Sequence, residues 1–236
     1  GKTLGLTIDI HKAVKAGSGI GSSASSAAAA VVGVNRLLNA GLSDAMLIEH
    51  AMEGEAMVSG GKHADNVAPA ILGEIVLIRS YNPLDLVTIP SPEQLWAVLL
   101  HPHIEIKTEM SRSLLSERIK LKEAVSQMGN VGGLVAGLYT ADYDLIGRSM
   151  DDVIAEPMRG DLIPGYREVK KTALKNGARG VSISGSGPSV FAVCKGEADA
   201  QRTGSAIKAM YPKYQIPFDI YISKVNKEGT QVIDSY

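Results

Sequence analysis

The stretch that decides the fold is AGSGIGSSASSAAAAVVGVNRLLNAG, Ala16 to Gly41. Glycine takes every second position from 17 to 21, and an alanine-rich run then predicts a helix from about Ser23 to Asn39. The first turn of a helix leaves backbone N–H groups unpaired and partly positive, and glycines let the backbone approach an anion closely. The stretch therefore predicts a phosphate-binding loop at a helix start, with an ordinary tight turn as the alternative.

Two other nucleotide-binding motifs do not fit. The dinucleotide fingerprint needs a third glycine where Ser22 stands, and it follows a strand that is apolar throughout. The segment before this loop, LTIDI from Leu6, alternates instead and predicts a strand with one exposed face. A Walker A loop needs Gly-Lys-Ser/Thr, which the chain does not contain.

Composition narrows the class of protein. The 24 basic and 25 acidic residues nearly cancel and form no basic block, which argues against a nucleic-acid partner. No stretch approaches the roughly 20 apolar residues of a membrane span. The single cysteine, Cys194, cannot form a disulfide within the chain and is expected to pack as a small hydrophobe. We expect a cytoplasmic protein.

The remaining elements follow from hydrophobic periodicity and turn residues. Ser43 is expected to cap a helix from about Asp44 to Val58, and ILGEIVLI predicts a strand. The proline-rich stretch SYNPLDLVTIPSPEQ places a domain boundary near Pro90. The elements expected after it are strand LWAVLL, helices over Glu109–Val153, helix GYREVKKTALKNG, strands GVSIS and SVFAVC joined by GSGP, a helix over Ala198–Met210 and strand FDIYIS. This order is typical of an α+β fold.

Five motifs along the chain match one family in order. GSGIGSSAS, HADNVAPA from His63 and SGSGPSV from Ser184 resemble the GHMP kinases, a family of small-molecule kinases. HADNVAPAILG, TEMSR (Thr108 to Arg112) and EPMRGDLIPG (Glu156 to Gly165) are most similar to its homoserine kinase branch.

The resemblance implies a two-domain α+β fold. Residues 1–90 would form an amino-terminal ATP-binding domain like domain 2 of ribosomal protein S5, and residues 91–236 a ferredoxin-like carboxy-terminal domain. Members of this family normally have several dozen residues before the glycine loop that this chain does not contain, so we expect the amino-terminal domain to be incomplete here.

The resemblance also implies an activity. It is the transfer of the γ-phosphate of ATP to the hydroxyl of L-homoserine, with Mg²⁺, by a homodimer. Two alternatives stay open at this point. One is another GHMP kinase, of the mevalonate or diphosphocytidyl-methylerythritol type, and the other is a module that holds nucleotide without transferring phosphate.

The nucleotide site is expected in the glycine loop and the start of the helix. Its predicted residues are Lys15, Ala16, Gly17, Ser18, Gly19, Ile20, Gly21, Ser22, Ser23, Ala24 and Ser25. Glu55 shares a helix face with apolar Ile48 and Met52, where a carboxylate needs a partner unless it reaches solvent at the edge of that face. The resemblance implies that Ser22 and Glu55 hold the Mg²⁺ of Mg-ATP and contribute to catalysis.

The carboxylate and ammonium groups of homoserine indicate which side chains would bind it. Arginine grips a carboxylate bidentately, and an asparagine or aspartate receives an ammonium. Arg112 and Arg159 are therefore the carboxylate candidates, with Arg159 also in a catalytic role, and Asn66 is the candidate for the polar head; either arginine could instead be a surface residue. The other predicted acceptor-binding residues are His63, Asp65, Thr108, Gly185, Ser186 and Gly187. No general base is predicted.

Overall fold

The computed structural model describes residues 5–14, 17–59, 61–106 and 108–233, without the side chains of residues 58, 59, 108, 109 and 112. The chain divides into two compact units, which are described separately. Unit 1 is Gly1–Ala16, Gly21–Val87 and Glu228–Tyr236, and unit 2 is Gly17–Ile20 and Thr88–Lys227. The glycine loop thus belongs to unit 2, and the helix that follows it belongs to unit 1. The predicted domain boundary near residue 90 stays a prediction.

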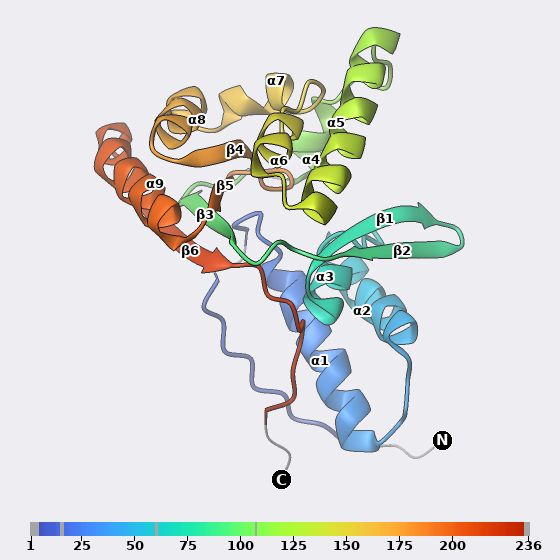
Figure 1. Cartoon of the computed structure of the whole chain (residues 1–236). Helices are drawn as coiled ribbons and strands as arrows, with labels where there is room; N and C mark the ends of the chain where they lie inside the picture. Colours follow the sequence, from blue (N-terminus) through green and yellow to red (C-terminus); the bar gives the residue numbers. More distant parts are fainter. Residues whose placement is uncertain (1–4, 15–16, 60, 107, 234–236) are drawn as a thin grey trace. The chain divides into compact units, whose positions relative to one another are not determined.

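Unit 2 is built on a four-stranded antiparallel sheet in the order β4-β5-β3-β6 (Figure 1). The strands are β3 (Leu95–Pro102), β4 (Ala178–Ile183), β5 (Val190–Lys195) and β6 (Phe218–Lys224). With α8 (Tyr166–Lys175) before β4 and α9 (Glu197–Met210) before β6, the order is the β-α-β-β-α-β pattern of ferredoxin-like folds. The predicted α+β class and all four of these strands are confirmed.

The core of unit 2 lies between this sheet and its helices. Leu100 of β3 stands opposite Val190 and Ile220, and it packs in one buried cluster with Ile207 of α9. Cys194 is fully buried in the same cluster, and burial raises the pKa of its thiol. It packs as a small hydrophobe, as predicted.

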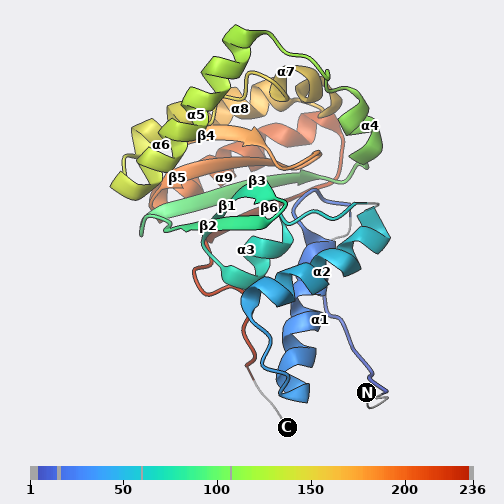
Figure 2. The ribbon, with the colours of Figure 1, turned by 90° about the vertical axis from the view of Figure 1, so that its right-hand side faces the viewer.

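In the described chain, four helices of very different length connect β3 to α8. They are α4 (Thr108–Ser113), α5 (Leu121–Thr140), α6 (Tyr143–Ser149) and α7 (Glu156–Arg159), followed by a 3₁₀ turn, Gly160–Leu162. Helices α5 and α6 lie side by side (Figure 2). Asp142 caps α6 by accepting the N–H groups of Asp144 and Leu145, which explains the sharp turn between the two helices.

The described residues of unit 1 form three helices and a hairpin. They are α1 (Ser22–Leu38), α2 (Asp44–Ser59), α3 (Val67–Leu72), β1 (Ile75–Tyr81) and β2 (Leu84–Ile89), whose last two residues lie beyond the limit of the unit. The predicted helices α1 and α2 are confirmed, and the Ser43 hydroxyl accepts the N–H of Met46 as a cap (3.4 Å). Small residues of α1, Ala24 and Ala28, are fully buried against α2 and α3.

Two local expectations were wrong. The segment from Leu6 to Ile10 is not a strand: no described strand pairs with it, and Leu6, Ile8 and Ile10 are exposed. The first residues of ILGEIVLI belong to α3, and Gly73 ends that helix with a positive φ of 75°. The proline-rich stretch, for which no strand was predicted, contains β2, and the Asn82–Pro83 turn joins β2 to β1 in a hairpin.

In the part of the chain described here, no helix has the combination of length and apolar character needed to cross a bilayer.

Candidate functional site

The glycine loop has a left-handed residue at every second position. Gly17, Gly19 and Gly21 have φ values of 74°, 74° and 73°, a region that side chains disfavour. A segment in which left-handed residues alternate with others can present successive N–H groups on one side, and such a concavity binds anions. The alternation of glycine in the sequence therefore has a conformational cause.

A second glycine loop packs directly on the first. It is the turn between β4 and β5, and a Cβ atom on Gly19 would lie 2.5 Å from the carbonyl oxygen of Gly187. The Ser184 hydroxyl donates to the Gly19 carbonyl (2.7 Å), and the Ser189 hydroxyl donates to the Ser18 carbonyl. Two motifs far apart in the chain are thus joined within unit 2.

Helix α1 begins without a side-chain cap. Its N-cap is Gly21, which has no side chain to accept the first N–H groups, and its first turn contains no acidic residue. The positive end of a 17-residue helix is therefore available to an anion. This supports the sequence-based prediction of a phosphate site here.

Glu55 lies beside that first turn, within unit 1. Its Oε1 accepts the hydroxyl of Ser23 (2.9 Å), while the hydroxyl of Ser22 donates to the Val14 carbonyl (2.8 Å). The face predicted for α2 is confirmed, because Ile48 and Met52 are buried and Glu55 is half-buried. The two serines therefore have different hydrogen-bond partners: Ser23 binds the carboxylate of Glu55, and Ser22 binds the backbone of the segment before the glycine loop.

This arrangement fits Mg²⁺ bound chiefly by phosphate. The described residues contain no group of three or more His, Cys, Asp or Glu side chains that could hold a metal by themselves. Mg²⁺ needs only one or two carboxylates when phosphate oxygens and water complete its shell. A hydroxyl that donates a hydrogen bond, like that of Ser22, still has lone pairs to offer a cation.

The HADN motif lies next to the same helix start. A Cβ atom on Gly21 would be 3.1 Å from Oδ1 of Asn66, so the Asn66 side chain lines the entrance to α1. Asp65 is exposed. His63 is half-buried, and its ring lies against Gly61, where a Cβ atom would be 2.6 Å from Nε2.

Arg159 joins three of the matching motifs inside unit 2. Its Nε donates to the carbonyl of Ser111 (3.1 Å), and its Nη1 donates to the carbonyl of Gly185 (3.2 Å). The fully buried Ser111 in turn donates its hydroxyl to the carbonyl of Ser186 (3.0 Å). Helix α7 carries Arg159 and is anchored by Glu156, which pairs with Lys170 at 2.6 Å. A guanidinium has five N–H donors, so two bonds to carbonyls do not exhaust it.

Four predicted site residues lie outside what the structure describes. They are Lys15 and Ala16, together with the side chains of Thr108 and Arg112. Sequence reasoning also missed four residues that contact the loops, namely His101, Ser111, Ser184 and Ser189. The serines could have been found from the sequence, because serine beside a glycine loop indicates a hydrogen bond to that loop. Nothing in the sequence around His101 indicates its contact with Ser189.

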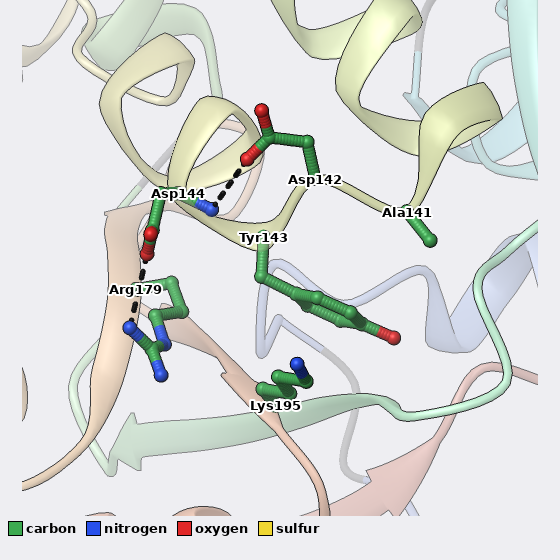
Figure 3. A pocket seen from close by; sticks show the side chains of 6 residues that line it. All are labelled: Ala141, Asp142, Tyr143, Asp144, Arg179 and Lys195. Carbon is green, nitrogen blue, oxygen red and sulfur yellow. Dashed lines mark hydrogen bonds and ion pairs between the residues drawn. The ribbon is translucent and has the colours of Figure 1, made fainter.

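A separate hollow of about 210 Å³ lies between α6 and the ends of β4 and β5 (Figure 3). The charged side chains that line it make contacts with neighbouring parts of the fold. Asp142 caps α6, Asp144 pairs with Arg179 (3.0 Å), and the Lys195 ammonium lies 5.1 Å from the centre of the Tyr143 ring. We assign it no ligand.

Comparison with known proteins gives matches in both parts of the chain. The family model described as GHMP kinases N terminal domain matches residues 1–74, and that described as GHMP kinases C terminal matches residues 134–213. A homoserine kinase of Chlorobium phaeobacteroides strain BS1 is 51% identical over 230 residues, covering 97% of this chain and 72% of the relative. One of Xanthomonas campestris is 35% identical, with 97% and 70% covered.

Solved structures show the same likeness. The crystal structure of homoserine kinase from Cytophaga hutchinsonii matches with a TM-score of 0.89 and 50% identity, over 92% of this chain and 69% of that one. The mevalonate kinase of L. major, solved with R-mevalonate, matches with a TM-score of 0.68 at 20% identity, over 88% and 67%. The second match shows the fold alone.

The two glycine positions make a matched pair of substitutions. Gly17→Ala adds a methyl group to open space, so only the left-handed backbone opposes it, at a cost of about 1–2 kcal/mol. Gly19→Ala has the same φ and also places its Cβ against the Gly187 carbonyl, so we expect a loss of at least about 3 kcal/mol. Urea unfolding, followed by fluorescence of the single tryptophan, Trp96 of β3, measures both. Equal losses would contradict the packing of the two loops.

Proposed function

The chain belongs to the GHMP kinase family, and we propose that it transfers the γ-phosphate of ATP to the hydroxyl of L-homoserine, giving O-phospho-L-homoserine. One observation carries this proposal. The relatives that share half of its residues over nearly its whole length are homoserine kinases. The local geometry supports it, because an uncapped helix start and a left-handed glycine loop are suited to phosphate.

Phosphoryl transfer depends on positioning and charge neutralisation more than on covalent help from the protein. In our proposal the loop Gly17–Gly21 and the first turn of α1 donate backbone N–H groups to the phosphates of ATP. The positive φ angles of the glycines aim these groups, and the helix dipole adds to the attraction. No side chain is needed between the backbone and the phosphate.

We propose that Ser22 and Glu55 hold the Mg²⁺ that accompanies ATP. When bound, the metal would neutralise charge on the transferring phosphate. Ser23 orients Glu55 by donating to Oε1, and this bond fixes the carboxylate beside the first turn of α1. A single carboxylate is sufficient for this task.

For the acceptor, we propose that Arg159 and Arg112 bind the carboxylate of homoserine and that Asn66 binds its polar head. His63, Asp65, Thr108 and the turn Gly185–Gly187 are the other residues that we propose for acceptor binding. Because its Nη1 donates to the Gly185 carbonyl while its Nε donates to the Ser111 carbonyl, Arg159 would also tie that turn to α4. We assign no general base. A homodimer stays a prediction from the family, and a cytoplasmic location stays a prediction from composition.

A panel of acceptors tests the reaction itself. With Mg-ATP, we expect ADP release to depend on L-homoserine and to be at background with mevalonate or diphosphocytidyl-methylerythritol, because these lack the amino-acid head that pairs with arginine and asparagine. A coupled ADP assay measures this. Turnover of mevalonate alone would favour the other kinase class, and ATP binding without acceptor-dependent ADP release would favour a binding module.

Glu55→Gln tests the metal site. The substitution keeps shape and hydrogen bonding but removes one charge, so we expect turnover to fall about a hundredfold or more while the protein stays folded. Glu53→Gln is the matched control on the same helix, because Glu53 is exposed and pairs only with Lys62 among the contacts described. The measurement is kcat of both variants and of the unaltered chain across a Mg²⁺ titration. An unchanged kcat of Glu55→Gln at low Mg²⁺ would show that Glu55 does not belong to the metal site.

Arg159→Ala tests the acceptor site. Loss of a charge-assisted hydrogen bond predicts a KM for homoserine raised roughly ten- to a hundredfold, with a much smaller change in the KM for ATP. Arg167→Ala is the control, because Arg167 is exposed and pairs with Asp161. Steady-state kinetics with each substrate varied in turn gives both constants. The reverse pattern would assign Arg159 to the nucleotide.

A further inference from the structure

The glycine loop is held by hydroxyl groups from another part of unit 2. Two successive carbonyls of the loop Gly17–Ile20, those of Ser18 and Gly19, accept hydrogen bonds from Ser189 and Ser184. These two serines stand at the two ends of the β4–β5 turn, and the Ser184 N–H donates to the Ser189 carbonyl (2.8 Å) across that turn. The loop is therefore tied to the sheet.

A buried histidine fixes the direction of one of these bonds. Ser189 is fully buried, and its only hydroxyl hydrogen goes to the Ser18 carbonyl, which can only accept. His101 of β3 is 4% exposed, and its Nδ1 lies 3.2 Å from the Ser189 oxygen. Nδ1 must then be the donor and carry a proton. The bonds run one way, from His101 to Ser189 to Ser18.

Because the peptide group is planar, holding a carbonyl of the loop also fixes the direction of the N–H group in the same peptide. In a trans peptide the C=O and the N–H point in opposite directions. When the Ser18 and Gly19 carbonyls are held toward the β4–β5 turn, the N–H groups of Gly19 and Ile20 are held away from it. These N–H groups belong to the left-handed concavity that suits an anion.

The loop also contains a polar atom that a ligand would satisfy. Ser18 is 1% exposed, and its Oγ has no hydrogen-bond partner among the residues that the structure describes. A buried hydroxyl without a partner costs about 1–3 kcal/mol and calls for an explanation. An oxygen of a bound phosphate would supply the missing acceptor.

We propose that His101 and Ser189 are positioning residues for nucleotide binding. His101 orients the Ser189 hydroxyl, Ser189 holds the Ser18 carbonyl, and the Gly19 N–H is thereby aimed at a phosphate oxygen. This inference rests on the proposed function, because it takes ATP as the ligand of the loop. It concerns affinity for the phosphate chain and leaves binding of the nucleoside and of the acceptor unchanged.

The test compares four variants of the full chain by calorimetry, with ATP and with adenosine as ligands, and no acceptor present. Ser189→Ala and His101→Leu break the chain of bonds, so we expect ATP affinity to fall about tenfold, the worth of one hydrogen bond. His101→Asn places an amide N–H near the position of Nδ1 and should restore most of the affinity. Adenosine affinity should stay within about twofold in every variant.

Thr203→Val is the matched control. Thr203 is also fully buried in unit 2, and its hydroxyl donates to the Asn176 carbonyl (3.0 Å), far from the loop in the sequence. The substitution removes a buried hydrogen bond of the same kind, so it lowers stability, and we expect ATP affinity to stay unchanged. Trp96 fluorescence during unfolding reports the stability of every variant.

The outcomes separate this inference from the proposed function. If the unaltered chain binds ATP and phosphorylates homoserine while Ser189→Ala keeps its ATP affinity within about twofold, the positioning role is wrong and the function stands. An equal loss of affinity in Thr203→Val would likewise overturn the role. If Ser189→Ala does not fold, equal affinities of His101→Asn and His101→Leu would overturn it. Failure of the unaltered chain to bind ATP would overturn both.

Discussion

The contact of backbone on backbone between two glycine loops is the constraint on which unit 2 and its candidate site depend. Gly19 lies against the β4–β5 turn so closely that a single Cβ atom would collide with the Gly187 carbonyl. That turn is placed by the register of β4 on β5, and β5 pairs in turn with β3. The loop's position therefore follows from the sheet, and its own glycines only permit it.

The start of α1 shows how one short segment can combine opposite electrostatic roles. Its uncapped N–H groups and helix dipole favour an anion, while Glu55 beside it favours a cation. In the proposed site, a phosphate with its metal would satisfy both, whereas either ion alone would satisfy only one. The alanines that follow in α1 are small enough to let α2 approach, so the same residues that make the helix also bring the carboxylate beside its first turn.

The proposed acceptor side differs from the nucleotide loop, because its side chains hold the backbone of the β4–β5 turn in place. Arg159 and Ser111 both bind carbonyls of the β4–β5 turn, and Glu156 anchors the short helix that carries the arginine. A helix of four residues has little stability of its own, so it depends on such contacts. Three motifs that are separate in the sequence thus form one connected network.

Local patterns in the sequence determined the elements that carry strong local signals. The alanine run specified α1, apolar periodicity specified α2 and β3, and the glycine spacing specified a loop with left-handed residues, for which phosphate is the proposed ligand. A local pattern gave a wrong prediction where the segment had no neighbour to pair with. The alternating segment from Leu6 has no neighbouring strand in the described chain, so it does not form the predicted strand. Only the tertiary structure decided which side chains hold the loop. His101 and Ser189 are 88 residues apart, and Ser189 and Ser18 are 171 apart, so no local pattern relates them. Their hydrogen bonds exist because the sheet brings the strands together, and a hydrogen bond requires contact in space, not nearness in sequence.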